Sequence, residues 1–361
     1  MHAHLRRSLF LSGLLAAPLS AQIRDAGARM ERVADGVYVI VHANATDEWP
    51  HGNTGVIVGR DAVAVIDATY LPSRARADIA LIRKVTPKPV RYLIYTHWHF
   101  DHNNGGIAYR EAFPDVAIVS QRDNARFIEL NGIWWAKMSG QPDSKKRAGL
   151  AQMEQEVVRG ADSSGRALAA GERAMHQRHV RERRAELEEL TRLTVVTPDL
   201  LFDGELTLPL GRRVLELRDR GKANSPHDVT IWLPQDRVLF TGDILVADPY
   251  PYTGASWPVP WAAVLRDLEA MPVAVVVPGH GPAYRDHRYT RLVREMMEAV
   301  TTRVDSAARR GLTLEQAQDS VTLEDLRARW PVDDAEAHRD DWRTVVRVLV
   351  ERAWRGVRGQ G

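Results

Sequence analysis

The chain of 361 residues contains no cysteine. Disulfide bonds, thiolate metal ligands and lipid attachment through a cysteine are therefore excluded. Any metal ion in this protein has to be bound by histidine, aspartate, glutamate or asparagine side chains. This absence narrows the kinds of metal site that the sequence can form.

The chain also lacks a strong excess of charge of either sign. Its formal net charge is +2, with 27% charged residues, and this balance gives no sign of a nucleic-acid partner. No Gly-x-Gly-x-x-Gly motif opens a helix, which argues against a nucleotide-binding fold. We therefore expect a small-molecule substrate.

Long apolar runs are absent after the first residues of the chain. The start has the order of a signal peptide: a basic "MHAHLRR", an apolar "SLFLSGLLAAPL", and "LSA" before Gln22. The apolar stretch is too short to span a bilayer as a helix. The sequence thus predicts cleavage of residues 1–21, a periplasmic or secreted protein, and no stable membrane insertion afterwards.

Strand-like and helix-like segments alternate along much of the chain, which is typical of α/β proteins. We predict the first half of the fold at residues 22–121 and the second half at 194–287. A helical insertion with dense charge is expected at 122–193, and C-terminal helices at 288–361. No internal repeat appears.

The stretch "YTHWHFDHNNGG" concentrates side chains that bind metals. It places His97, His99, Asp101 and His102 within six positions, directly after the apolar strand "VRYLIY". Open α/β sheets usually place their sites at such strand ends. On an extended loop His97 and His99 project to the same side, while Asp101 and His102 can point toward a second ion. Imidazole and carboxylate ligands suit zinc and similar divalent ions.

This loop resembles the His-x-His-x-Asp-His motif of the metallo-β-lactamase superfamily. Further motifs follow in that family's order. In "GNTGVIV" and "AVIDAT", Asp67 takes the position of a buried aspartate that supports the histidine loop; "VLFTGD" ends at Asp243, and "VPGHG" contains His280. The resemblance covers most of residues 33–285. It implies an α/β fold that is a four-layer αββα sandwich, with the site along one edge of the β-sandwich.

The resemblance implies one or two bound metal ions, with zinc expected first and iron or manganese as alternatives. The implied ligands are His97, His99 and a third residue for one ion, Asp101, His102 and His280 for the other, and Asp243 between them. In the resembling hydrolases, a metal-bound hydroxide attacks a carbonyl group. Asp101 would orient the water or act as the general base. The expected reaction is hydrolysis of an amide, lactam, ester or thioester.

The sequence departs from the family pattern at the third ligand of the first ion. Where the family usually has "GxxHTxGD", this chain reads "GKANSPHD", with Asn224 at the histidine position and His227 where glycine is common. Asparagine offers a neutral carbonyl oxygen instead of an imidazole nitrogen. Three interpretations follow. The first site is weakened and one ion binds, or Asn224 is a weak oxygen ligand of a two-ion site, or the loop shifts and His227 supplies the nitrogen.

Aromatic residues gather in two further stretches, "GIWWAKM" and "DPYPYTGASWPVPW". The second follows Asp243 directly, and apolar walls of this kind suit a hydrophobic organic substrate. Packing of the insertion onto the core would explain the same rings. The aromatic residues are Trp134, Trp135, Tyr250, Tyr252, Trp257 and Trp261. Lys222, beside the ligand loop, either binds a substrate carboxylate or lies on the surface.

A hydrolase is the leading hypothesis for the function. The second is a redox enzyme of the same fold, such as an iron-dependent sulfur dioxygenase, which would need the histidine that Asn224 replaces. The third is a non-catalytic metal-binding or ligand-binding protein that has lost a site. The metal content of the purified protein separates the third hypothesis from the first two.

The signal peptide gives the first testable prediction. When the full-length chain is produced in a bacterial host, the mature protein should begin at Gln22, because signal peptidases cleave after the small-residue site that follows the apolar segment. N-terminal sequencing of periplasmic material measures this directly. Intact Met1 on protein that stays in the cytoplasm would contradict the prediction.

Overall fold

The computed structural model describes residues 23–25, 27–45, 50–140, 145–247, 249–330 and 338–359. The expected signal peptide and its cleavage site lie outside these ranges, so both stay predictions. No helix within the described ranges is both long enough and apolar enough to cross a membrane.

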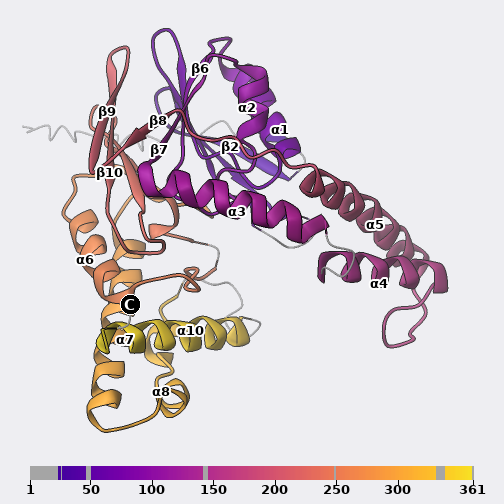
Figure 1. Ribbon diagram of the computed structural model, residues 1–361, viewed down its shortest axis with the longest axis vertical. Coiled ribbons are helices and arrows are strands. Elements are labelled where there is room, and N and C mark those ends of the chain that lie inside the picture. Colours follow the sequence, from indigo (N-terminus) through magenta and orange to yellow (C-terminus); the bar gives the residue numbers. More distant parts are fainter. Residues whose placement is uncertain are drawn as a thin grey trace, which may run out of the picture.

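Two β-sheets form the centre of the molecule (Figure 1). The first contains eight strands that neighbour one another in chain order. They are β1 (Ile23–Asp25), β2 (Ala28–Ala34), β3 (Val37–His42), β4 (Thr54–Val58), β5 (Val63–Ile66), β6 (Val90–Ile94), β7 (Ala117–Gln121) and β8 (Leu200–Phe202). Pairing is antiparallel from β1 to β5 and parallel from β5 to β8.

The second sheet has five strands in the order β13, β12, β11, β10 and β9. They are β9 (Glu205–Leu210), β10 (Arg213–Asp219), β11 (Val229–Leu233), β12 (Val238–Phe240) and β13 (Val275–Val277). Only the β12–β13 pair among these is parallel. The carboxyl ends of these two strands therefore meet at the same edge of the sheet.

Alternating side chains of the strands divide the interior into three cores. Ala64 of β5 packs between the two sheets, whereas its neighbour Val65 packs against the helices α1 (Pro72–Val85) and α2 (Gly106–Ala112). In β12, Phe240 packs between the sheets and Leu239 packs against α6 (Pro258–Glu269) and α7 (Arg288–Arg309). Successive strand side chains point to opposite faces, and strands such as β5 and β12 are buried on both of them. The predicted four-layer αββα sandwich is confirmed.

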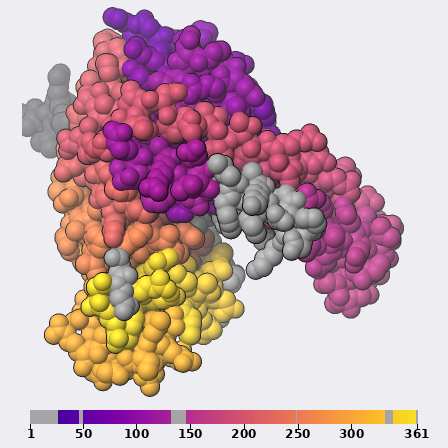
Figure 2. Space-filling view, in the orientation of Figure 1, coloured from indigo at the N-terminus to yellow at the C-terminus, as the bar shows by residue number. Residues whose placement is uncertain are grey.

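A helical insertion separates β7 from β8. It consists of α3 (Arg122–Gly140), α4 (Lys145–Arg159) and α5 (Ala170–Thr191). Helix α3 contacts β7 and β8, while α4 and much of α5 extend away from the body as an arm (Figures 1 and 2). The two helices of the arm share a small apolar core of their own around Leu150, Val180 and Leu187.

The C-terminal helices enlarge the core that covers the second sheet. They are α7, α8 (Leu314–Ser320), α9 (Glu324–Arg327) and α10 (Arg339–Val357), and they lie together at one end of the molecule (Figure 1). Trp342 of α10 is fully buried there, and its indole N–H donates to the carbonyl oxygen of Thr322 at 3.0 Å. Trp261 also belongs to this core and donates to the carbonyl oxygen of Ile244 at 3.1 Å. Trp261 is therefore a residue of the core.

Candidate metal centre

The histidine loop leaves the carboxyl end of β6 and packs tightly on the end of the neighbouring strand β5. The amide of Ala68 donates to the carbonyl oxygen of His102 at 2.7 Å, and the amide of Gly105 donates to that of Thr69 at 3.2 Å. A Cβ atom at Gly105 would collide with the carbonyl oxygen of Ala68. Glycine is thus required where the loop turns into α2.

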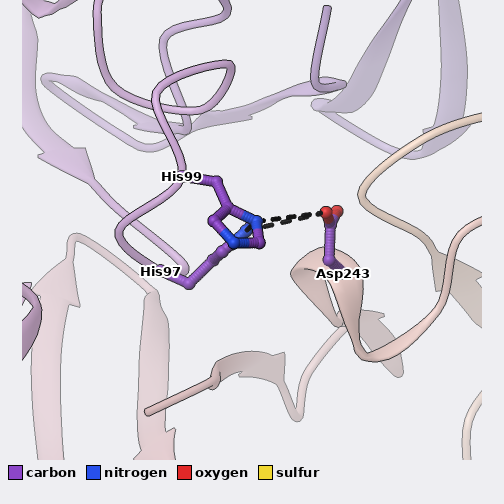
Figure 3. Close-up of side chains that lie close together, drawn as sticks. All are labelled: His97, His99 and Asp243. Atoms are coloured by element: carbon purple, nitrogen blue, oxygen red, sulfur yellow. Dashed lines mark hydrogen bonds and ion pairs between the residues drawn. The ribbon is translucent and has the colours of Figure 1, made fainter. Parts of the chain in front are cut away.

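His97, His99 and Asp243 form the first group of ligand-type side chains (Figure 3). His97 Nε2 lies 2.9 Å from His99 Nδ1. Asp243 Oδ2 lies 3.6 Å from His97 Nε2 and 4.0 Å from His99 Nδ1. All three side chains are buried, and their ligand atoms lie within 4.8 Å of one another. This arrangement can bind one metal ion.

Asp101, His102 and His280 form the second group. His280 Nε2 lies 3.2 Å from both His102 Nε2 and Asp101 Oδ2. Asp243 Oδ1 completes the group, at 3.3 Å from His102 Nε2 and 3.5 Å from His280 Nε2. The carboxylate of Asp243 therefore stands between the groups and turns one oxygen toward each.

Asp67 fixes the orientation of two ligand rings. Its Oδ2 lies 2.8 Å from His102 Nδ1 and accepts a hydrogen bond from the Thr96 hydroxyl at 2.8 Å. The Thr96 amide donates to Oδ1 at 2.8 Å, and the Thr96 hydroxyl lies 3.0 Å from His97 Nδ1. The Nδ1 atoms of His97 and His102 are thus occupied, and each Nε2 faces the cluster. Such supporting contacts hold metal-binding imidazoles in one tautomer and direction.

The cluster carries an electric field that favours positive charge. Burial by itself would raise the pKa of Asp243, but the imidazoles of His102 and His280 hold it well below its usual range. Burial by itself would lower the pKa of His280, yet Asp243 and Asp101 raise it to about 9. The same carboxylates raise the pKa of His102 well above its usual value against the effect of burial. A field that favours a proton on these rings also favours a metal cation between them.

Two buried oxygen atoms support this assignment. Asp243 Oδ1 and Asn224 Oδ1 are both buried, and neither accepts a hydrogen bond within the described part of the chain. A buried polar atom without a partner is costly unless another group satisfies it. The donor set, made of imidazole nitrogens and carboxylate or amide oxygens, suits divalent ions such as zinc. The residues present therefore fit a metal centre.

Asn224 and His227 lie in the loop between β10 and β11, and the structure separates their roles. Asn224 is fully buried, and its Nδ2 donates to the carbonyl oxygen of Tyr252 at 2.6 Å. His227 Nδ1 lies 2.9 Å from Asp219 Oδ2, and its Nε2 lies 3.3 Å from Asp123 Oδ2. Both nitrogens of His227 thus face carboxylates outside the cluster. The interpretation in which this ring supplies a ligand has no support in the structure.

Asp228 closes the same loop. The amide and the hydroxyl of Ser225 donate to its two carboxylate oxygens at 2.7 and 2.8 Å. The amide of Asp228 in turn donates to the carbonyl oxygen of Gly221 at 3.1 Å. Burial raises the pKa of Asp228 to about 8 in spite of these hydrogen bonds. The position of Asn224 is therefore set by a closed turn rather than by a freely moving loop.

A cavity of about 460 Å³ opens onto the ligand groups. Its floor is formed by the ligand residues His99, Asp101, Asp243 and His280. The remaining lining residues are Asn44, Pro50, Trp98, Phe100, Val246, Pro249, Tyr250, Pro251, Tyr252, Ala255, Asp341 and Val345. None of these described residues is lysine or arginine. The cavity is thus mainly apolar, with its negative charges on the floor and at Asp341.

The structure places Tyr250 and Tyr252 in this lining but puts two other candidates elsewhere. Lys222 is exposed, and its Nζ stands 5.3 Å from the ring centroid of the half-buried Trp257. Neither residue lines the cavity, so the hypothesis that Lys222 binds a substrate carboxylate there is not supported. Trp134 and Trp135 belong to α3, but their side chains lie outside the described residues.

Several lining residues were not predicted from the sequence, and four of them matter most for the shape and charge of the cavity. Trp98 and Phe100 alternate with the histidines of the motif "HWHFD", and this apolar alternation is a signal that could have identified them. Asp341 and Val345 come from α10, far along the chain. No local pattern indicates that this helix reaches the site.

Asp67 gives a prediction for metal binding. Asp67→Ala should weaken the affinity for the tighter metal ion by about 10- to 100-fold, because His102 loses the partner that orients its ring. Asp219→Ala is the matched control. It removes a carboxylate that lies 2.9 Å from Nδ1 of His227, a histidine outside the cluster, whereas the Asp67 carboxylate lies 2.8 Å from Nδ1 of His102. Competition titration with a chromogenic chelator measures both. Equal affinities in the two variants would contradict the assignment.

Comparison with known proteins agrees with this geometry. Residues 47–280 match the family model of the metallo-beta-lactamase superfamily. A linear primary-alkylsulfatase from Pseudomonas sp. (strain ATCC 19151) is 25% identical over 286 residues, which cover 74% of this chain and 49% of that protein. The chain thus spans about half the length of this curated relative.

Solved structures show the same fold. The stereoselective inverting sec-alkylsulfatase Pisa1 from Pseudomonas sp. has a TM-score of 0.59 at 18% identity, covering 90% of this chain and 50% of that one. A metallo-beta-lactamase from Pontibacter korlensis has a TM-score of 0.52 at 16% identity, covering 75% of this chain and 99% of that one. The resemblance found in the sequence is thereby confirmed. With its fold, its paired ligand groups and a family match over most of its length, this chain belongs to the metallo-β-lactamase superfamily.

Proposed function

We propose that this protein hydrolyses esters with an apolar alcohol part, and that alkyl sulfates are the first substrates to consider. The observation that carries the proposal is the apolar cavity of about 460 Å³ whose floor is the metal centre. This arrangement supports a substrate with one polar reacting group at the metal ligands and an apolar chain away from them.

The choice of a sulfate ester rests on two observations. The curated relative is a linear primary-alkylsulfatase, and an alkyl sulfate has a single anionic group attached to an apolar chain. Among the described lining residues there is no lysine or arginine, so a substrate anion away from the reacting group, such as the carboxylate of a β-lactam, finds no cationic partner. An amide, lactam, ester or thioester carbonyl is the second candidate, supported by membership of the superfamily.

The ligand set supports zinc as the proposed metal, with one or two ions. When bound, such an ion lowers the pKa of a coordinated water to about 7 and polarises an ester oxygen. Asp101 lies on the cavity floor with its Oδ2 at 3.2 Å from His280 Nε2. From there its carboxylate can orient the attacking water and accept its proton. The products are the alcohol and hydrogen sulfate, so one water is consumed for each ester cleaved.

The apolar wall has a separate role in this proposal. Trp98, Phe100, Tyr250 and Tyr252 stand around the reacting group and would exclude bulk water while they hold the alkyl chain. Exclusion of water strengthens the electrostatic interactions of the charged floor. The buried ring of His102, held by Asp67, needs no rearrangement when the substrate enters.

The substrate class is tested with protein loaded with zinc, manganese or iron. Sulfate release from octyl and decyl sulfate is measured by ion chromatography, alongside turnover of 4-nitrophenyl octanoate and a chromogenic β-lactam. We expect the highest kcat/KM for an alkyl sulfate. Asp101→Asn should lower this value by about 10²- to 10⁴-fold, because the proton acceptor is lost.

Asp123→Asn is the control for this experiment, because Asp123 contacts His227 outside the metal centre. Its kcat/KM should equal that of the unchanged protein. The proposal fails if no metal supports sulfate release, or if the β-lactam is the better substrate. Full activity of Asp101→Asn would remove the role given to that carboxylate.

Asn224 gives a prediction about the number of ions. If it occupies the third ligand position of the first group, Asn224→His should restore a nitrogen ligand and raise the metal content from about one ion toward two ions per chain. His227→Ala should leave the content unchanged, because that ring faces Asp219 and Asp123. His280→Ala should lower it, since the second group loses a ligand.

Elemental analysis after dialysis measures all three variants. The opposite result, in which His227→Ala loses metal and Asn224→His gains none, would show that the loop binds the ion through His227. A metal content of zero in the unchanged protein would favour the non-catalytic hypothesis.

A further inference from the structure

We infer that helix α10 forms one wall of the substrate pocket and selects the ester that enters. Val345 limits the length of the apolar chain, and Asp341 excludes substrates that carry a second negative charge at the far end. This inference deepens the proposed function and rests on it for the identity of the reacting group.

Helix α10 presents two faces with different neighbours. Asp341 and Val345 are four positions apart, so they lie on the same side of the helix, and both line the cavity that reaches Asp101 and His280. Trp342 is fully buried in the core that covers the second sheet. Val345 packs partly against the same core. The helix is therefore fixed by its core contacts, and Asp341 and Val345 lie where it borders the cavity.

The same C-terminal helices fasten the loop at residues 249–256, which carries Tyr250 and Tyr252. Three hydrogen bonds make this connection: Trp330 Nε1 to the carbonyl oxygen of Pro249 at 2.8 Å, the Thr253 hydroxyl to that of Val345 at 3.3 Å, and the Arg352 guanidinium to that of Gly254. The loop wall and the helix wall thus form one connected surface. Its shape is set by the position of α10.

Aromatic packing makes this surface stiff. The ring of Tyr250 lies 5.2 Å from the ring of Trp342 and 5.8 Å from that of Trp330, measured between centroids. The contact with Trp342 is edge-to-face and the contact with Trp330 is tilted, and aromatic pairs at these distances favour specific ring orientations. A stiff wall selects ligands by size, because it does not move aside for a longer chain.

Asp341 determines the charge preference at the far side of the cavity. Its side chain is 62% exposed, so it stands where the cavity meets solvent, and its Oδ2 lies 2.9 Å from His338 Nδ1. A second anionic group on the substrate would lie near this carboxylate and be repelled by it, because like charges repel. No lysine or arginine among the described lining residues would offset this repulsion. A neutral or cationic end is favoured instead.

A carboxylate in the first turn of a helix is also stabilising in its own right. The test therefore needs a measurement that stability alone would not change. The ratio of affinities for two ligands in one variant meets this requirement, because a general loss of folded protein lowers both affinities together.

Alkyl sulfonates serve as probes, because their carbon–sulfur bond is not hydrolysed. Their binding to metal-loaded protein is measured by calorimetry for chains of six to fourteen carbons. Affinity should rise by about fourfold per methylene until the cavity is filled, and then level off. Val345→Phe should move the levelling point to a shorter chain.

Val348→Phe is the matched control, the same substitution on the same helix at a residue outside the cavity lining. It should keep the original levelling point. The inference about Val345 is overturned if both variants behave alike, or if no sulfonate binds to the unchanged protein.

The charge preference is tested with decane-1-sulfonate and 10-sulfodecanoate, which adds a carboxylate at the far end. The unchanged protein should bind the monoanion more tightly, and Asp341→Asn should reduce the ratio by roughly fivefold. Asp340→Asn removes a neighbouring carboxylate that is 93% exposed and outside the lining, and it should leave the ratio unchanged. Equal ratios in all three proteins would overturn the role of Asp341.

These binding results are independent of turnover. If the sulfonates show the expected pattern and no alkyl sulfate is cleaved, the proposed function fails while the selectivity of α10 stands. If alkyl sulfates are cleaved and Val345→Phe leaves the chain-length profile unchanged, the proposed function stands and the inference is wrong.

Discussion

The candidate metal centre depends on the hydrogen bonds of one buried carboxylate, that of Asp67. A charged group without water must receive hydrogen bonds, and here the donors come from Thr96 and from the ring of His102. Because β5 and β6 are parallel neighbours, their carboxyl ends meet, and the amide of Asp67 donates to the carbonyl oxygen of Ile94 at 2.9 Å. The backbone of Asp67 takes a φ of 61° at this junction. One side chain thus fixes both the loop's path and the direction of its ligands.

The second sheet brings its ligands to the same place by the same geometry. Strands β12 and β13 are parallel, so Asp243 and His280, which follow their carboxyl ends, arrive at one edge. The side chain of Asn53 joins the halves of the fold, since its Nδ2 donates to the carbonyl oxygens of Pro278 and Gly281 at 2.9 and 2.8 Å. Gly279 lies so close to the Asp243 carboxylate that a Cβ atom would collide with it. The absence of a side chain at Gly279 therefore leaves room for the Asp243 carboxylate.

The sequence predicted the fold, and the structure brings the predicted ligand-type residues together, because the signals for both are local. Four ligand-type residues on one strand-end loop, and single ligands after two apolar strands, need only spacing and period to be recognised. The wall of the cavity depends instead on how irregular loops and amphipathic helices pack. The Lys222 ammonium lies over the ring of Trp257 and does not line the cavity. Val345 lines the cavity from a helix whose pattern indicates only a buried face. Likewise, the sequence left open whether Asn224 or His227 completes the first ligand group, whereas in the structure both ring nitrogens of His227 face the carboxylates of Asp219 and Asp123.

The site therefore consists of two parts with different requirements. The cluster at the sheet edges supplies charge and chemistry, and its buried hydrogen bonds tolerate little change. The wall formed by α10 and the 249–256 loop supplies selectivity, and its apolar residues can change in size without removing a ligand. The parts meet at Tyr252, whose carbonyl oxygen accepts a hydrogen bond from Asn224 and whose ring stands 5.6 Å from that of His99. In the proposed arrangement in which Asn224 is the third ligand of the first ion, its amide nitrogen is held by the wall and its oxygen accepts no hydrogen bond in the described chain. A shift of that loop would then change the first ligand group as well as the pocket, and this side chain would couple substrate selection to occupancy of the first metal position.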